Sequence, residues 1–128
     1  MHNGTTATPT WNSAFNNPTV NWSAATDPCT LELGGTWRIP TFTEWNNVFN
    51  GGGWTDYNGP WNSALKIHAA GYIGSGSLSG RGQYTFYWSS SIVSKGIANN
   101  LGAFSFANSA SVGNFGTGNA LSLRCIKD

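Results

Sequence analysis

The stretch that decides the fold is TWRIPTFTEW, residues 36–45. Trp37 and Ile39 lie two positions apart, so an extended backbone places both side chains on one face. Pro40 has no backbone N–H and biases the residue before it toward an extended conformation, so the strand ends there. The stretch therefore predicts a short strand that stops directly before a helix.

A helix is expected to begin at the end of this strand. Thr41 and Glu44 have the spacing of a capping box, in which the Thr hydroxyl and the Glu carboxylate each accept a first-turn amide. The helix should span residues 42–50 and end at the three glycines 51–53. It is the one convincing helix start in the sequence, and its apolar stripe consists of Trp45, Val48 and Phe49.

The composition favours one small domain rich in strands and loops. Of the 128 residues, 9% are charged, 14% are aromatic and 17 are glycine, a mixture that favours an all-β or α+β domain over a helical bundle. The formal net charge of +1 provides no basic stripe for a phosphate backbone, so nucleic acid is not an expected partner. Insertion into a membrane is not expected either, because no apolar run approaches about 18 residues. The first residues show no signal-peptide pattern.

The two cysteines, Cys29 and Cys125, lie near the two ends of the expected domain. In a chain that is poor in charge and rich in Gly, Ser, Thr and Asn, they favour one disulfide in an exported protein. Two buried free thiols are the alternative. A zinc site would need a second ligand pair that the sequence lacks.

Further strands are expected where apolar residues alternate with polar ones. Tyr84, Phe86 and Trp88 give the strongest such pattern. Other strand segments are expected at 19–22, 67–73, 103–107 and 121–125. Turns or loops are expected at 27–29, 51–60, 74–80, 92–100 and 108–119, and the pattern at 61–67 fits either a helical turn or the start of a strand. Residues 1–26 are expected to form an extended lead-in and residues 27–128 the domain.

Several short motifs stand in order along the chain: DPC at 27–29 with WRIPT and EW, LK and AAGY at 65–72, YWSSS at 87–91 and LRCIKD at 123–128. Together they resemble the major paralogous domain family (FISUMP) of Bacteroidetes-type bacteria. In that family a DPC…WR-[IV]-PT..EW segment, a YWSS segment and a closing RC-[IV]-[KR]-D segment frame the domain. The resemblance covers residues 27–128.

The resemblance implies an α+β domain with a C-type-lectin-like fold: one or two helices, a small twisted antiparallel sheet and a large lobe of loops. It also implies an exported domain of surface proteins, lipoproteins or phage-type adhesins. Similar domains serve as variable ligand-binding modules in diversity-generating retroelement systems. The C-terminal region departs from the Asn-, Tyr- and Arg-rich pattern of many members because it carries small residues, among them Ala98, Ala103, Ala107 and Ala110.

The sequence offers little for catalysis or metal binding. His68 falls in an expected β segment, and no pattern joins a nucleophile to a base and a carboxylate, so no catalytic residue is assigned and an enzyme is not expected. Residues 56–59, DYNG, are similar to half of a calcium loop, but no bidentate acid follows at the right distance. A plain Asx turn is favoured, with calcium as the alternative and no other cofactor expected.

The seven tryptophans are expected to divide between the core and the surface. A domain with few aliphatic residues builds its interior from rings, which assigns Trp37, Trp45 and Trp88 to the core. Exposed rings are suited to a sugar face or to an aromatic anchor site. The surface candidates are Trp54, Tyr57 and Trp61.

The binding surface is expected in the C-terminal loops, because Ser, Gly and Asn give adaptable hydrogen bonding and loops on a rigid scaffold carry most binding sites. We therefore expect a non-catalytic extracellular module of adhesin or receptor-binding type. It would recognise a protein or glycan on a cell surface, as part of a longer protein on a bacterium or phage particle. A spacer domain without a ligand is the alternative. The expected binding residues are Asn99, Asn100, Phe104, Asn108, Ser109, Asn114, Phe115 and Asn119.

Overall fold

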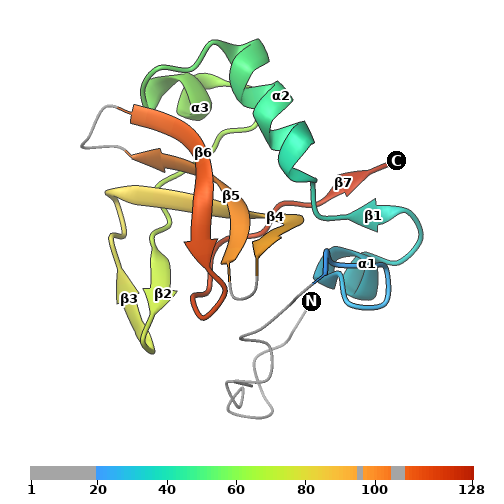
Figure 1. Ribbon diagram of the computed structural model, residues 1–128. Helices are drawn as coiled ribbons and strands as arrows, with labels where there is room; N and C mark the ends of the chain where they lie inside the picture. Colours follow the sequence, from blue (N-terminus) through green and yellow to red (C-terminus); the bar gives the residue numbers. More distant parts are fainter. Residues whose placement is uncertain (1–19, 95–96, 105–108) are drawn as a thin grey trace.

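Strand β4, Tyr84–Ser94, is the longest strand, and the other elements are arranged around it (Figure 1). The structure, a computed structural model, describes residues 20–94, 97–104 and 109–128, with the backbone only for 98–104 and 109. Over these residues the fold is α+β, with few helices and small antiparallel sheets, as the sequence predicts. The other elements are α1 (Pro28–Leu33), β1 (Trp37–Arg38), α2 (Phe42–Gly52), α3 (Asn58–Asn62), β2 (Tyr72–Gly74), β3 (Ser77–Ser79), β5 (Ile97–Phe104), β6 (Ser109–Gly116) and β7 (Ile126–Lys127).

Four antiparallel pairings join the described strands into three sheets. The largest sheet has the order β4-β5-β6, so that β6 forms one of its edges. Strands β2 and β3 form a hairpin in which both turn residues, Ser75 and Gly76, have positive φ angles of 52° and 78°, as a type I′ turn requires. Strand β1 pairs with β7, which brings the organising stretch beside the last residues of the sequence.

Strand β4 is buried on both faces because an apolar cluster lies on each side of it. Successive side chains of a strand point to opposite faces, so Phe86, Tyr87 and Trp88 serve the two clusters in turn. One cluster consists of Trp45, Trp54, Ile67 and Tyr87, and the other of Phe86, Trp88 and Leu121.

Helix α2 begins as predicted and ends two residues later than predicted. The Glu44 N–H donates to Oγ1 of Thr41 at 3.2 Å, and the Thr41 N–H donates to the Glu44 carboxylate at 2.7 Å, so the capping box is present. Gly53 ends the helix in the left-handed conformation. The indole Nε1 of Trp45 donates to the backbone carbonyl of Trp88 at 3.1 Å and ties α2 to β4.

Residues 27–29 begin a helix instead of the expected turn. The Asp27 carboxylate caps α1 by accepting the N–H groups of Cys29 at 2.8 Å and Thr30 at 3.3 Å. Pro28 occupies the first turn, where its missing N–H costs no hydrogen bond. Periodicity missed this helix because six residues are too few to show an apolar stripe. In the part of the chain that the structure describes, no helix has the length and apolar character needed to cross a membrane.

Two expected strands are replaced by irregular backbone. Residues 67–70 do not pair as a strand, because Gly71 adopts a φ of 75° and the ladder of β2 starts only after it. The expected strand at 19–22 is absent over its described residues 20–22, and Trp22 makes a single backbone hydrogen bond, to the carbonyl of Ser90 at 3.0 Å. Helix α3 begins inside the expected loop 51–60 and ends at Asn62, so the start of the segment 61–67 is a helical turn and not the start of a strand.

The expected loops at 92–100 and 108–119 are largely strand, which corrects the sequence prediction. Strand β4 continues through residue 94, β5 starts at residue 97, and every residue of β6 is paired with a residue of β5. Small polar residues have low β-propensity, but cross-strand pairing overrides it here. The expected strand 103–107 is the end of β5, and its residues 105–107 lie outside the described part of the chain.

The segment 121–125 is not a regular strand. Ser122 forms an isolated bridge with Tyr87 of β4, after which the chain leaves β4 and joins β1 through β7. The expected alternation therefore fails: Leu121 is buried, whereas Leu123 is 43% exposed.

Candidate functional site

Several predicted binding residues lie on the hairpin of β5 and β6 instead of on loops. The register places Asn99 opposite Asn114 and Phe104 opposite Ser109, with Asn100 one position along β5. Directly opposed positions are the nearest neighbours across an antiparallel pair. These five predicted positions therefore lie on two adjacent strands in two groups, with Asn99, Asn100 and Asn114 near one end and the Phe104–Ser109 pair about 17 Å away at the other.

Two other predicted residues have structural roles. The Phe115 ring lies 4.8 Å from the Phe86 ring and 5.2 Å from the Tyr72 ring, measured between centroids, so it packs into a core cluster. The Asn119 side chain donates from Nδ2 to the carbonyl of Gly116 at 2.9 Å and holds the turn after β6. The remaining prediction, Asn108, lies outside the described residues.

Strand β6 is an edge strand, SASVGNFG, that contains no charged residue and no proline. Strand β5 occupies one side of it, and over the described ranges no backbone hydrogen bond joins its other side to a further strand. Ser111 and Asn114 are exposed, whereas Val112 packs against the cluster beneath α2. Natural sheets protect their edges with charges, prolines or bulges. An eight-residue edge without a charge or a proline is therefore open to pairing.

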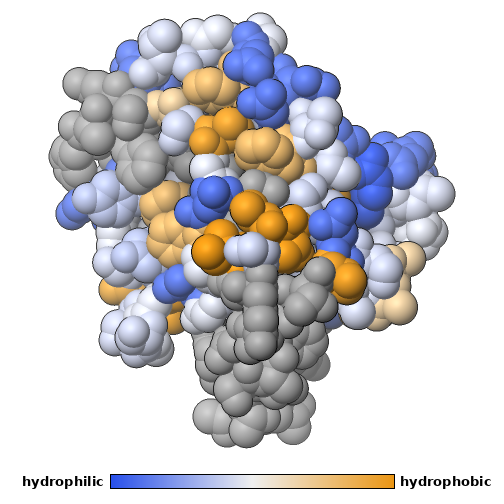
Figure 2. All heavy atoms as spheres, in the orientation of Figure 1, coloured by the Kyte–Doolittle hydropathy of each residue, from blue (hydrophilic) through white to orange (hydrophobic). Residues whose placement is uncertain are grey.

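Apolar surface adjoins the end of β6. Val93 and Ile97 lie on either side of the β4–β5 turn and are 51% and 41% exposed. Ile97 pairs with Gly116, the last residue of β6, so this apolar surface is continuous with the edge strand. Figure 2 shows apolar residues gathered in the middle of the face in view, with hydrophilic residues around them. Exposed apolar area next to an open edge adds contact surface for a partner.

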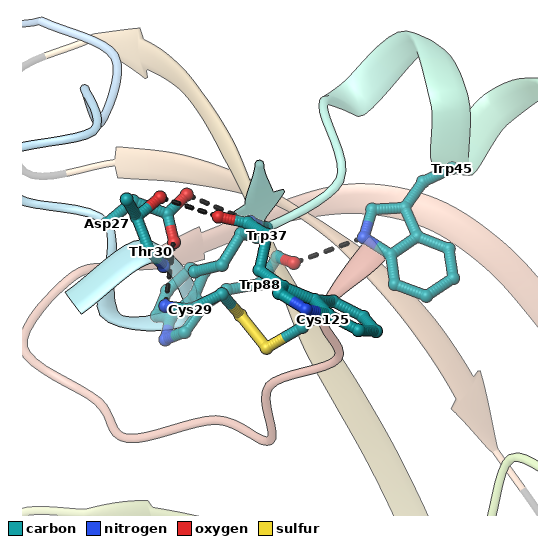
Figure 3. The surroundings of a disulfide bond; sticks show 8 residues. Asp27, Cys29, Thr30, Trp37, Trp45, Trp88 and Cys125 are labelled. Atoms are coloured by element: carbon teal, nitrogen blue, oxygen red, sulfur yellow. Dashed lines mark hydrogen bonds between the residues drawn. A yellow bond between two sulfur atoms is a disulfide. The ribbon is translucent and has the colours of Figure 1, made fainter. Parts of the chain in front are cut away.

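A disulfide between Cys29 and Cys125 closes the frame of the domain, as the sequence predicts (Figure 3). It joins α1 to the segment before β7, with 5.6 Å between the two Cα atoms. The buried Asp27 carboxylate, besides capping α1, accepts the N–H of Ile39 at 2.9 Å. One carboxylate therefore ties the first helix to the residue after β1.

Arg38 makes a second tie in the same region. Its Nη1 and Nη2 donate to the two carboxylate oxygens of Glu44 at 2.8 and 2.7 Å. Its Nε and Nη2 donate to the Asp128 carboxylate at 2.9 and 2.7 Å. Two hydrogen bonds from one guanidinium to one carboxylate fix the relative orientation of the two side chains and add to their electrostatic attraction. We call the set Asp27, Cys29, Arg38, Glu44, Cys125 and Asp128 the clasp.

The contacts among Arg38, Glu44 and Asp128 shift the pKa values of these three groups. Hydrogen bonds from Arg38 lower the pKa of Glu44 to about 2 and also lower the pKa of Asp128. Hydrogen bonds to Glu44 and then to Asp128 raise the pKa of Arg38 above its usual value. All three groups remain charged at neutral pH, so the clasp is suited to a permanent structural tie and not to proton transfer.

Two cavities lie beside the clasp. One of about 220 Å³ has Thr30, Trp37 and Ser90 in its wall and is partly polar. The other, of about 320 Å³, lies along α2 and has a largely apolar wall that includes Val48 and Leu65. Arg124 borders the second cavity, but its Nη2 donates to the Leu65 carbonyl at 2.6 Å and is occupied there. Neither cavity is lined by a histidine, so neither places a histidine base beside a hydroxyl.

The DYNG segment forms an Asx turn. Oδ1 of Asp56 accepts the N–H groups of Asn58 at 2.8 Å and Gly59 at 3.3 Å. Within residues 20–94, 97–104 and 109–128, no group of three or more His, Cys, Asp or Glu side chains could hold a metal ion. His68 is exposed on irregular backbone, because the expected β segment 67–73 does not form a strand at this residue.

The tryptophans divide in part as expected. Trp45 and Trp88 are buried as predicted, whereas Trp37 is only partly buried and lines the partly polar cavity. Trp54 is buried, which corrects its assignment to the surface. A Cβ atom on either Gly52 or Gly59 would collide with its indole, so these glycines provide room for a ring.

Sequence reasoning missed the partnership of Arg38 with Asp128. The two residues belong to motifs about 90 positions apart, and a long-range ion pair leaves no periodic signal. One signal was available: charged residues are rare in this chain, at 9%. A charged residue in the WRIPT motif and one of opposite charge in the LRCIKD motif are therefore candidates for an ion pair.

Comparison of the chain with protein-family models, with curated proteins and with solved structures finds no match. The candidate site therefore rests on the geometry of this chain: the open edge of β6 and the clasp, which lies away from β6 in Figure 1.

Proposed function

We propose that this chain is a non-catalytic binding module of adhesin or receptor-binding type, displayed outside a cell on a bacterial surface protein or a phage particle. The proposal includes a C-type-lectin-like fold of FISUMP type for residues 27–128. It is supported by the order of the sequence motifs together with small antiparallel sheets, few helices and a disulfide from the first helix to the last segment. Disulfides persist in oxidising compartments, which supports an exported location.

The observation that carries the proposal is the open edge of β6. An extended segment of a partner protein adds to such an edge as a further strand, with backbone hydrogen bonds that supply affinity. The exposed side chains of Ser111 and Asn114 and the apolar surface at Ile97 supply specificity. Retroelement diversification, as a finer form of the proposal, would fall on β6, where the exposed side chains of Ser111 and Asn114 can change without affecting the clasp.

The disulfide holds the two ends of residues 29–125 together, with 5.6 Å between the Cα atoms of Cys29 and Cys125. Neighbouring ends are common in domains. This arrangement is compatible with a module that presents β6 to a partner.

The proposal is tested with labelled protein on an array of extended peptides and purified bacterial surface proteins, followed by calorimetric titration of the strongest binder. The double variant Ser111→Lys/Asn114→Lys places charges on the edge, as natural protected edges do. Leu78→Lys is the matched control, because Leu78 is exposed on β3 of the other hairpin.

We expect the double variant to bind at least about tenfold more weakly than the parent, with an unchanged melting temperature, while Leu78→Lys retains the parent affinity. Absence of saturable binding by the parent would favour the spacer function. Equal affinity of the parent and the double variant would remove β6 from the binding surface.

A further inference from the structure

An aromatic pair lies at α3: Tyr57, the residue before the helix, is partly buried, and Trp61, on the helix, is exposed. Trp61 is the one exposed tryptophan in the described part of the chain, at 46%. Its indole is nearly parallel to the Tyr57 ring, with an interplanar angle of 21° and 6.3 Å between centroids. Rings at this separation are offset, so the pair presents a broader flat surface than either ring alone. The spacing of four residues places both on one side of the helix.

The pair stands on a rigid base. Trp54 is buried between Gly52 and Gly59, which lie at the end of α2 and inside α3 and provide the space for its indole. The Asx turn of Asp56 fixes the backbone where α3 begins. Burial raises the pKa of Tyr57, so its ring stays neutral at physiological pH. The aromatic surface is therefore preorganised, and a ligand would lose little free energy in ordering it.

Polar groups neighbour the aromatic pair in sequence and on α3. Asn58, Asn62 and Lys66 are exposed, and the Lys66 ammonium donates to the Asn62 carbonyl at 3.4 Å. Two amides, one cation and the partly exposed Asp56 supply both donors and acceptors without a net charge. This environment is suited to a neutral ligand that is rich in hydroxyl groups.

The size of the pair favours a small ligand over a protein interface. A stable protein interface buries roughly 800 Å² on each partner, far more than two rings provide. A pyranose ring has the dimensions of one aromatic ring. Its C–H face can lie against the indole while its hydroxyls reach the amides.

We propose that Tyr57 and Trp61, with the amides of Asn58 and Asn62, bind a neutral oligosaccharide. The site goes beyond the protein-binding edge of β6 and does not depend on it. The two surfaces involve separate elements, α3 and β6, so each is tested with its own variants.

The test is a titration of ¹⁵N-labelled protein followed through the indole Nε1–H resonances, with the Trp61 resonance assigned by its absence in Trp61→Phe. The probes are cellotetraose, maltotetraose, mannotetraose and the tetramer of N-acetylglucosamine, each at millimolar concentration. N-acetyltryptophanamide is the comparison probe for an aromatic peptide side chain. The variants are Trp61→Ala and Asn58→Ala/Asn62→Ala, and the matched control is Leu78→Ala, which truncates another exposed apolar residue.

We expect at least one tetrasaccharide to shift the Trp61 resonance in a saturable manner. Trp61→Ala, which lacks this resonance and is followed through the backbone amide resonances of Asn58–Asn62, should bind up to about tenfold more weakly. The double amide variant should bind severalfold more weakly, while Leu78→Ala and Ser111→Lys/Asn114→Lys leave the affinity unchanged. The double amide variant keeps both rings, so it tests the site even if Trp61→Ala unfolds. No shift with any tetrasaccharide, a shift with N-acetyltryptophanamide alone, or parent affinity in both site variants would overturn the proposal.

Discussion

Replacing Glu44 by Gln separates the two structural roles of this residue. Gln at the third helical position still completes a capping box, because its side-chain oxygen accepts the Thr41 N–H. The neutral amide cannot pair with the Arg38 guanidinium, which now donates to both Glu44 oxygens. Glu44→Gln therefore removes the ion pair and keeps the cap, whereas Glu44→Ala removes both.

The magnitude follows from the pKa of Glu44, which is lowered from 4.5 to about 2, mainly by hydrogen bonds from Arg38. At 1.36 kcal/mol per pKa unit this shift corresponds to roughly 3 kcal/mol. The side chain is 37% exposed, so solvent screening reduces the expected loss for Glu44→Gln to about 1 kcal/mol. Glu44→Ala should cost about 1 kcal/mol more, through loss of the cap.

The loss should depend on pH. The pKa of Glu44 is lower in the folded state, so the ion pair contributes its full stability above the unfolded value and loses it as the pH falls toward about 2. Urea unfolding from neutral to low pH should show a gap between parent and Glu44→Gln that closes in acid. Glu32→Gln, an exposed change on α1, is the charge-matched control and should follow the parent. Coincident curves at neutral pH, or a gap independent of pH, would refute the assignment.

Three further changes test the disulfide, the hairpin and the core. Replacing Cys29 and Cys125 by Ser opens a separation of 96 residues and should cost about 4–5 kcal/mol in urea unfolding; alkylation of both thiols in the native parent would contradict the bond. Phe115→Ala should lower the unfolding free energy by about 3 kcal/mol, whereas Asn114→Ala should change it by no more than about 0.5 kcal/mol. Similar losses for the two variants would contradict the core position of Phe115 and the exposed position of Asn114. Thr85→Val should raise the unfolding free energy by about 1 kcal/mol, because the buried Thr85 hydroxyl has no hydrogen-bond partner among the described residues. A variant less stable than the parent would indicate that this hydroxyl is hydrogen-bonded in the folded protein.

Local signals in the sequence predicted the frame of the domain. The capping box of Thr41 and Glu44 depends on residues three apart, and the pattern of Tyr84, Phe86 and Trp88 depends on residues two apart. The disulfide followed from composition, because two cysteines in a charge-poor chain have few other uses. These features need no knowledge of distant contacts.

Apart from the disulfide, features that depend on partners far away in the sequence were not predicted. Strands β5 and β6 consist of residues with weak strand preference, and their pairing with each other and with β4 makes them strands. Phe115 looked like a loop contact until this register placed its ring against Phe86. The glycines around Trp54 indicated a flexible loop, but they provide space for its indole.

The proposed binding role of β6 is tested most directly by amide hydrogen exchange, measured by mass spectrometry with and without the strongest binder from the peptide and surface-protein array. We predict that binding slows exchange within Ser109–Gly116, because a partner strand would accept the amides on the outer edge of β6. Exchange at α1 and β1, the elements joined by the clasp, should stay unchanged. Saturating binder that leaves exchange within Ser109–Gly116 unaltered would contradict the binding role of this strand.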